Sequence, residues 1–383
     1  MGVETVWLLS ALMSVTAHAA DWRTSWDGAL YGYLSETAVD VALAPPVNQV
    51  FQVAQHNRTA EARLNFKAEN ESLRVSARPI LLAQGGSQTG REAYLSQWQL
   101  RWRAAEDWSV SAGRELLNWG PVQFRSPSSP YYFDNGRSNP LRELSGMDAQ
   151  KLSWTPDAGH ALTLAHLSGS GHARVSPDPW RDSWLLRWEP RGEDWAAGLA
   201  LARAGSQPVF VGLHAQYTPD DAWLLYGEAG SGARSGAVDV LVANALGQPA
   251  PRHGDWLLGA SYTLESGSSV YAEWMRNGHG LSAVAQPAAF NALPQMTAFT
   301  AAPLLGRDYL HLVWQSNLMD DGGTARLMAT HGFDGTDTEL SAYAERHLNG
   351  RASVFALAAA GESGSFVRQR TRSLSAGVRV ALP

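Results

Sequence analysis

The chain of 383 residues has no cysteine, and only 17% of its residues are charged. The absence of cysteine excludes disulfides and thiolate metal sites. The net charge of -6 shows no strong excess of either sign, and no nucleic-acid-binding motif is present, so we expect no nucleic-acid partner. A nucleophile elbow, a zinc-protease helix motif and a phosphate-binding loop are also missing, which argues against an enzyme and gives no reason to expect a cofactor or a metal.

Long apolar runs are also missing. After residue 20 no run reaches the roughly eighteen residues that a membrane-spanning helix needs. The short apolar run from Val6 to Val15 precedes Ala17-His18-Ala19, which predicts a signal peptide over residues 1–19 and one mature domain over residues 20–383. Glu4, and the lack of Lys or Arg ahead of the run, do not fit the usual positive start of such a peptide. A buried N-terminal helix is the alternative.

Aromatic residues, by contrast, are plentiful and flank short polar turns. Trp102 and Trp108 enclose the turn over residues 104–107, and Trp188 and Trp195 enclose the turn over residues 190–194. The same arrangement recurs at Trp154, Tyr217, Trp223, Tyr262 and Tyr271. Because Trp and Tyr combine an apolar body with a polar tip, they collect where hydrocarbon meets lipid head groups. The pattern is typical of the aromatic girdle of a membrane β-barrel.

Apolar and polar residues alternate with a period of two between these turns, as in Trp184-Leu186-Trp188 and Leu374-Ala376-Val378. Counting such segments from Trp26 to Leu382 gives about eighteen candidate strands. Short connections such as Glu69 to Ser72 and Leu348 to Arg351 alternate with long ones near 36–59, 120–146, 230–253 and 277–306.

A soluble β-sandwich would also alternate, but it would not require long loops at one end and aromatic-flanked turns at the other. The expected fold is therefore all-β: a transmembrane antiparallel up-and-down barrel of about eighteen strands with long extracellular loops, in the outer membrane of a Gram-negative envelope.

The polar residues between the apolar stripes would face the lumen of this barrel. The early strands contribute a basic wall, and the later strands contribute acidic residues. The basic residues are Arg63, Lys67, Arg74, Arg78, Arg101, Arg103, Lys151 and Arg187, and the acidic ones are Glu228, Glu273 and Glu345. A basic wall would concentrate anions and steer them inward. The alternative is that these charges pair across the lumen and stiffen the barrel.

The most distinctive segment is the long connection after Trp119-Gly120-Pro121. It is rich in aromatic residues and arginines, which suit contacts with sugar rings and with carboxylates. The candidate constriction and substrate-binding residues are Arg125, Tyr131, Tyr132, Phe133, Arg137 and Arg142. One interpretation folds this loop into the lumen as a constriction, and the other leaves it outside as a self-packed external loop.

The stretch from Gly113 to Pro121 reads G-R-x-x-x-x-W-G-P and resembles outer-membrane barrels of bacterial capsule assembly and exopolysaccharide export. Similar G-R and W-G pairs at strand ends also occur in substrate porins. The resemblance implies a porin-like channel for anionic or carbohydrate solutes, or the barrel of a polysaccharide export system. A closed barrel that binds polysaccharide or assists envelope assembly is the alternative. The partners it implies are outer-membrane lipid and lipopolysaccharide, with polysaccharide or periplasmic export proteins as further candidates.

Overall fold

The structure is a computed structural model whose described part is mostly β-strand. It describes residues 22–43, 50–134, 136–137, 139–169, 171, 180, 182–205, 207–233, 237, 239–240, 243, 248, 251–280, 304, 306–317, 322–334, 337–363 and 367–383. The expected signal peptide over residues 1–19 lies outside these residues.

Eighteen strands are present in the described part of the chain, which confirms the expected number. They are β1 Arg23–Leu43, β2 Val50–Glu69, β3 Leu73–Gly86, β4 Gly90–Arg103, β5 Trp108–Glu115, β6 Met147–Asp157, β7 His160–Gly169, β8 Ser183–Pro190, β9 Trp195–Ala204, β10 Phe210–Tyr217, β11 Trp223–Gly232, β12 His253–Thr263, β13 Ser269–Arg276, β14 Asp308–Gln315, β15 Gly323–Gly332, β16 Thr338–His347, β17 Ala352–Ser363 and β18 Val367–Leu382.

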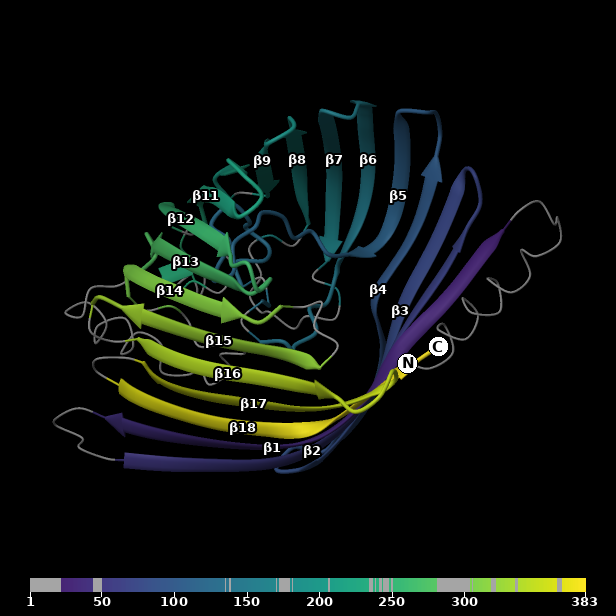
Figure 1. Ribbon diagram of the computed structural model, residues 1–383. Helices are drawn as coiled ribbons and strands as arrows, with labels where there is room; N and C mark the ends of the chain where they lie inside the picture. Colours follow the sequence, from purple (N-terminus) through teal and green to yellow (C-terminus); the bar gives the residue numbers. More distant parts are fainter. Residues whose placement is uncertain are drawn as a thin grey trace.

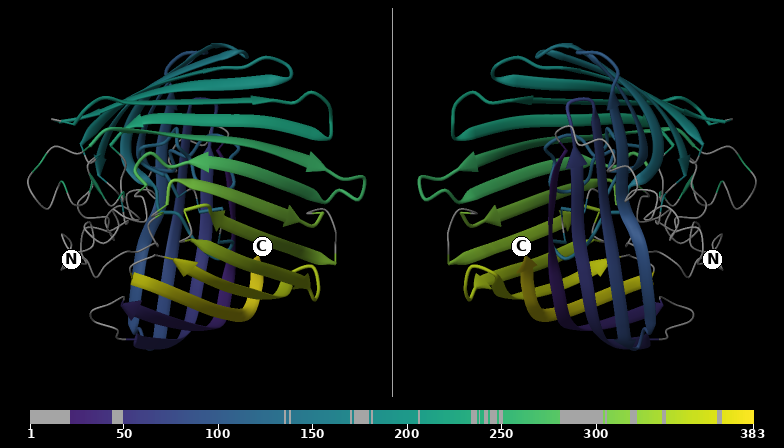
Figure 2. Two further views of the ribbon diagram at one scale, coloured as in Figure 1. Left: turned by 90° about the vertical axis from the view of Figure 1, so that its left-hand side faces the viewer. Right: turned by 90° about the vertical axis from the view of Figure 1, so that its right-hand side faces the viewer.

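Each strand pairs antiparallel with its neighbours in sequence, and β1 also pairs with β18 (Figures 1 and 2). Gly28 on β1, for example, lies opposite Leu64 on β2 and Leu382 on β18. The sheet is therefore a closed up-and-down barrel with no free edge, as predicted. No helix within the described ranges is long and apolar enough to cross a membrane.

The outer surface of the barrel carries the apolar stripe of every second residue. On β8, Trp184, Leu186 and Trp188 are exposed on the outer surface. Leu185, which lies between Trp184 and Leu186 in the sequence, points inward and is only 1% exposed. Aromatic residues beside the short turns are also exposed on this surface, and some of them stack: the ring centroids of Trp108 and Trp154 lie 5.9 Å apart. Exposed apolar side chains on a closed barrel are stable in lipid rather than in water. The outer surface therefore agrees with the expected outer-membrane location.

The predicted connections are mostly confirmed. The turns after β2 and after β16 occupy residues 70–72 and 348–351, and long connections follow β5, β11 and β13. The expected long loop over residues 36–59 is wrong, because β1 and β2 continue through it to the pair Ala42 and Val50. These strands have 21 and 20 residues, about twice what a tilted membrane strand needs, so they extend beyond the bilayer. β-branched pairs such as Val39 opposite Val53 favour this extended structure.

Two buried apolar clusters lie on the inner side of the barrel, where the connection after β5 packs against the strands. The first cluster includes Leu117, Trp119 and Tyr132 together with inward residues of β6 to β10. The second includes Val122 and Phe124 with inward residues of β11 to β14, namely Tyr226, Leu257, Met275 and Tyr309. The core of the protein thus lies inside the barrel, and the β5–β6 connection supplies much of it.

Candidate functional site

The β5–β6 loop, residues 116–146, crosses the interior of the barrel (Figure 1). Near its start, the backbone amides of Gln123 and Phe124 donate to the carboxylate of Glu273 on β13, over 2.6 and 2.8 Å. Near its end, Glu143 accepts from Arg78 on β3 over 3.0 Å. Around the closed ring of eighteen strands, β3 and β13 are eight positions apart in one direction and ten in the other, so the loop joins nearly opposite walls.

Glu228 on β11 forms a second anchor for the loop. Its Oε2 accepts from the hydroxyl groups of Ser126 and Ser128, over 2.6 and 2.7 Å, and from the backbone amide of Ser128 over 3.3 Å. Both Glu228 and Glu273 are buried. A buried carboxylate is stable only when it accepts several hydrogen bonds, and the loop supplies them. Two of the three expected lumen acids therefore hold the loop in place.

Three glycines allow the loop backbone to approach the wall closely. Gly212 on β10 and Gly230 on β11 lie directly opposite each other on the inner face. A Cβ atom at Gly212 would lie 2.1 Å from the carbonyl oxygen of Ser128, and one at Gly230 would lie 1.9 Å from that of Pro127. In the loop itself, Gly120 has a φ of +80°, and a Cβ there would lie 1.9 Å from Glu228. Any side chain at these positions would therefore displace the loop.

Substitution of Gly230 by alanine is expected to detach this part of the loop without preventing barrel formation. The added Cβ would lie 1.9 Å from the backbone carbonyl oxygen of Pro127 in the loop, and 2.9 Å from the ring atom Cζ of Phe210 on β10. The contact with loop backbone is the more severe of the two, because the Phe210 ring can rotate away. Trypsin should then cleave at the loop arginines faster than in the wild type, as mass spectrometry of the fragments would show. Gly32→Ala on β1, whose Cβ would meet only Val378 at 3.8 Å, is the matched control. Equal cleavage of both variants would contradict this role of Gly230.

The far end of the loop is held by charges. Arg63 on β2 forms an ion pair with Glu61 over 2.8 Å, lies 3.6 Å from Glu143, and donates to the carbonyl of Leu141 over 2.6 Å. Ser96 on β4 also donates to Glu143 over 3.3 Å. Burial raises the pKa of the Glu143 carboxyl above its ordinary value even though Arg78 and Arg63 act in the opposite direction. This cluster fastens the loop to β2, β3 and β4.

The three loop arginines expected to bind substrate are engaged mainly with the loop itself. Arg137 donates to the carbonyls of Val122 and Gly120 over 2.7 and 3.1 Å. Arg125 and Arg142 lie 3.7 and 2.5 Å from Asp134. Burial of Asp134 acts to raise its pKa, but the two guanidinium groups outweigh burial and the pKa lies below its ordinary value. In this arrangement the three arginines stabilise the loop.

The three consecutive aromatic residues are divided between the two apolar clusters. Tyr131 and Tyr132 pack in the first cluster, where their hydroxyl groups bond to Ser183 and to the carbonyl of Ser145. Phe133 packs against the second cluster. The loop therefore lies inside the barrel, as one interpretation of the sequence expected, and its aromatic residues form a small core, as the other expected.

Acidic residues of the same or the neighbouring strand accompany the residues of the expected basic wall. Lys67 and Arg74 both lie 2.9 Å from Glu69, and Lys151 lies 2.5 Å from Glu115. Arg187 pairs with Glu189, and its guanidinium carbon lies 4.8 Å from the ring centroid of Trp119. Arg101 donates to Ser109, and Arg103 lies opposite Ser109 in the register. The inner wall is thus a mixed network rather than a purely basic track.

The period of two in the sequence contains a signal for these acids. Glu61 and Glu69 share the odd numbering of Arg63 and Lys67, so a period of two places all four on the inner face of β2. The third expected acid, Glu345 on β16, accepts from Tyr343 on β16, Ser353 on β17 and Arg379 on β18. These partners are all wall residues, which makes Glu345 part of the wall network rather than a loop anchor.

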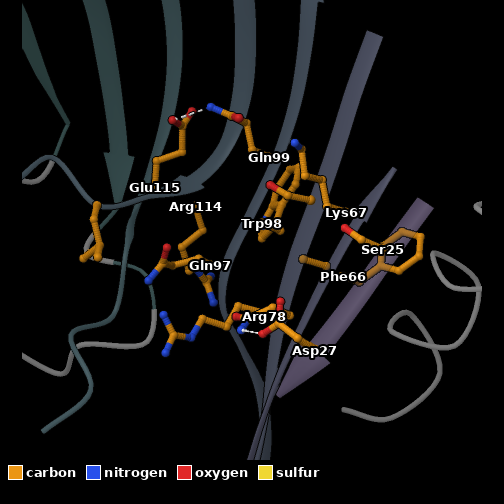
Figure 3. Close-up of a pocket in the computed structure, with 14 residues that line it drawn as sticks. Ser25, Asp27, Phe66, Lys67, Arg78, Gln97, Trp98, Gln99, Arg114 and Glu115 are labelled. Carbon is orange, nitrogen blue, oxygen red and sulfur yellow. Dashed lines mark hydrogen bonds between the residues drawn. The ribbon is translucent and has the colours of Figure 1, made fainter. Parts of the chain in front are cut away.

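A cavity of about 420 Å³ opens on the inner wall formed by β1 to β5 (Figure 3). Its polar lining includes Lys67, Arg78, Gln97, Gln99, Asp27 and Glu115. Asp27 accepts a hydrogen bond from Asn65 over 2.6 Å, and Glu115 accepts one from Gln99 over 2.6 Å. Arg78 and Gln97 are opposite each other in the register. Within the described part of the chain, the buried Nε of Arg78 and Nε2 of Gln97 have no hydrogen-bond acceptor.

Comparison with known proteins supports the fold only. No protein-family model and no curated protein matches the chain. Similar solved structures include Pseudomonas aeruginosa OpdQ, at 10% identity and a TM-score of 0.58, covering 94% of this chain and 100% of that one. OccK9 (OpdG) of the same organism has 15% identity and a TM-score of 0.57, and the match covers 94% of this chain and 99% of that one. OprD, also of this organism, has 11% identity and a TM-score of 0.56, and the match covers 92% of this chain and 96% of that one. The chain therefore has the fold of the OprD and Occ porins.

Proposed function

We propose that this protein is an outer-membrane channel for small solutes rich in hydrogen-bond acceptors. These solutes are either carbohydrates or anions such as carboxylates. The observation that carries the proposal is the cavity on the inner wall, whose lining residues Arg78 and Gln97 have buried donors, Nε and Nε2, without an acceptor in the described part of the chain. The porin fold supports a passage function, and the loop across the lumen supports selection among solutes.

A buried donor without an acceptor costs free energy, which an incoming carboxylate or hydroxyl oxygen would recover. The acids of the cavity do not compete for this position, because Asp27 accepts from Asn65 and Glu115 accepts from Gln99 and Lys151. Guanidinium and amide donors on adjacent strands suit a carboxylate, which can accept two hydrogen bonds at once. The cavity is therefore expected to bind an acidic or polyhydroxylated solute.

Substitution of Gln97 by glutamate is expected to weaken the binding of carboxylates to the channel. It replaces a donor with a charged acceptor of similar shape, so gluconate should block current in planar bilayers with an affinity about tenfold lower, or about 1.4 kcal/mol. Block by glucose, which has hydroxyl groups but no charge, should change less. Gln216→Glu on the inner face of β10, outside this cavity, makes the same change of charge and should leave gluconate block nearly unaltered. Unchanged gluconate block in Gln97→Glu would overturn the assignment of the cavity.

A second candidate function is a closed barrel that binds polysaccharide or serves polysaccharide export or envelope assembly. The loop anchored to both walls favours it, because a filled lumen passes little current. Glycan binding measured on the purified barrel, alongside conductance, separates the two functions. Binding without current supports the closed barrel, and current with gluconate block supports the channel.

A further inference from the structure

Three side chains from separate segments converge beyond the ends of β11, β12 and β13. Asp239 lies in the connection after β11, His253 begins β12, and His279 follows β13. One potential ligand atom from each lies within 4.8 Å of the other two. None of them belongs to the β5–β6 loop or to the cavity on β1 to β5.

The polar contacts of His279 require either a proton or a metal ion on its Nδ1. Its Nε2 lies 3.0 Å from the carbonyl oxygen of Gly232, and a carbonyl only accepts, so Nε2 must carry a proton. In a neutral ring Nδ1 is then an acceptor, yet it lies 3.0 Å from both carboxylate oxygens of Asp239. Acceptors do not bind acceptors. Either a proton or a metal ion must therefore lie between the ring and the carboxylate.

The arrangement suits a metal ion better than a single proton, because a second imidazole approaches the same carboxylate. His253 Nε2 lies 3.2 Å from Asp239 Oδ2, and the ring centroids of the two histidines are 4.9 Å apart. Metal bonds of about 2.0 to 2.1 Å in a tetrahedral site place neighbouring ligand atoms roughly 3.3 Å apart. The distances from Asp239 to His279 Nδ1, 3.0 Å, and to His253 Nε2, 3.2 Å, are close to this value. Small side-chain rotations would therefore complete the site.

The surroundings of the cluster have the features of a metal site. The Gly232 carbonyl holds the outer nitrogen of His279, which is how a ligating histidine is normally oriented. The side chain of His279 is 1% exposed and that of His253 is 44% exposed, so a metal ion can reach the cluster from the side of His253. Three protein ligands leave a fourth position open to water or solute.

We propose that Asp239, His253 and His279 bind a divalent transition-metal ion of the zinc, nickel or copper class. Two imidazoles and one carboxylate favour these ions over calcium and magnesium, which prefer oxygen ligands. The bound ion would tie the connection after β11 to the ends of β12 and β13. Metal would then control the position of this connection at the barrel rim.

Zinc titration of the tag-free, detergent-solubilised barrel by calorimetry tests the proposal. The wild type should bind one equivalent, and cobalt should give the visible spectrum of a site with nitrogen ligands. Removal of a ligand by His253→Gln or by Asp239→Asn should weaken zinc binding by at least about tenfold. His253→Gln alters an exposed side chain, and heat-modifiable migration on gels verifies that each variant is folded.

His160→Gln is the matched control, because His160 Nδ1 lies 3.1 Å from Asp157 in a similar pair. This variant should keep the zinc affinity of the wild type. The proposal is overturned if the wild type binds no zinc. It is equally overturned if folded His253→Gln and Asp239→Asn bind zinc as the wild type does. Neither result bears on gluconate block, so the channel proposal is tested separately.

Discussion

Deletion of residues 126–138 is expected to raise the single-channel conductance severalfold while leaving a folded, heat-modifiable barrel. The strands make their hydrogen bonds to one another around a closed ring, and the β5–β6 loop is not part of that ring. The deletion removes the serines that bind Glu228 and the aromatic residues that join the two apolar clusters. Conductance should rise and selectivity between anions and cations should decrease, because the segment across the lumen is lost.

Planar-bilayer recordings on the deletion variant measure this effect directly. A variant that inserts normally with unchanged conductance and unchanged gluconate block would show that the loop does not limit passage. That outcome would also remove Tyr131, Tyr132, Phe133 and Arg137, which the deletion takes out, as constriction or binding residues.

Substitution of Glu273 by alanine is expected to release the first half of the loop from β13. The carboxylate accepts from the amides of Gln123 and Phe124 and from the hydroxyl of Tyr226 over 2.6 Å. Hydrogen bonds to a charged group contribute about 1.5 to 3 kcal/mol each, and buried donors left without an acceptor add to the loss. The two bonds to the loop amides together correspond to about 3 to 6 kcal/mol, and the attachment of the loop to β13 should be weakened by roughly this amount.

The release should appear as faster tryptic cleavage in the loop and as additional noise in the open-channel current. Glu345→Ala is the matched control, since Glu345 also accepts from a tyrosine, a serine and an arginine, and all three are wall residues. It should leave loop cleavage unchanged. If trypsin cleaves the loop equally fast in both variants, general loosening of the barrel explains the effect and Glu273 has no special role as an anchor.

The barrel could be predicted from the sequence because each strand signals its own orientation. In Trp184-Leu186-Trp188, the period of two alone separates the lipid face from the lumen face. The error at residues 36–59 arose because strands that continue beyond the bilayer lose the apolar stripe that marks the membrane. Their pairing, with Val39 opposite Val53, depends on the partner strand rather than on lipid.

The anchoring of the loop could not be predicted in the same way. Glu228 and Glu273 meet loop residues that precede them by 100 to 150 positions, and no local pattern encodes such a contact. Gly212 and Gly230 appear in the sequence as ordinary small residues, and only the register shows that they face each other beneath the loop. The distribution of Tyr131, Tyr132 and Phe133 between two clusters likewise depends on the curvature of the closed wall.

The position of these anchors also sets an order of events during assembly. The β5–β6 loop is synthesised well before β11 and β13, so its hydrogen bonds to Glu228 and Glu273 cannot form until those strands are in place. A barrel built from its N-terminal strands alone would have Glu143 bound to Arg78 at one end of the loop and nothing to hold Gln123 and Ser126 at the other. Attachment of the first half of the loop therefore requires β11 and β13 to be in place, whichever strands fold first.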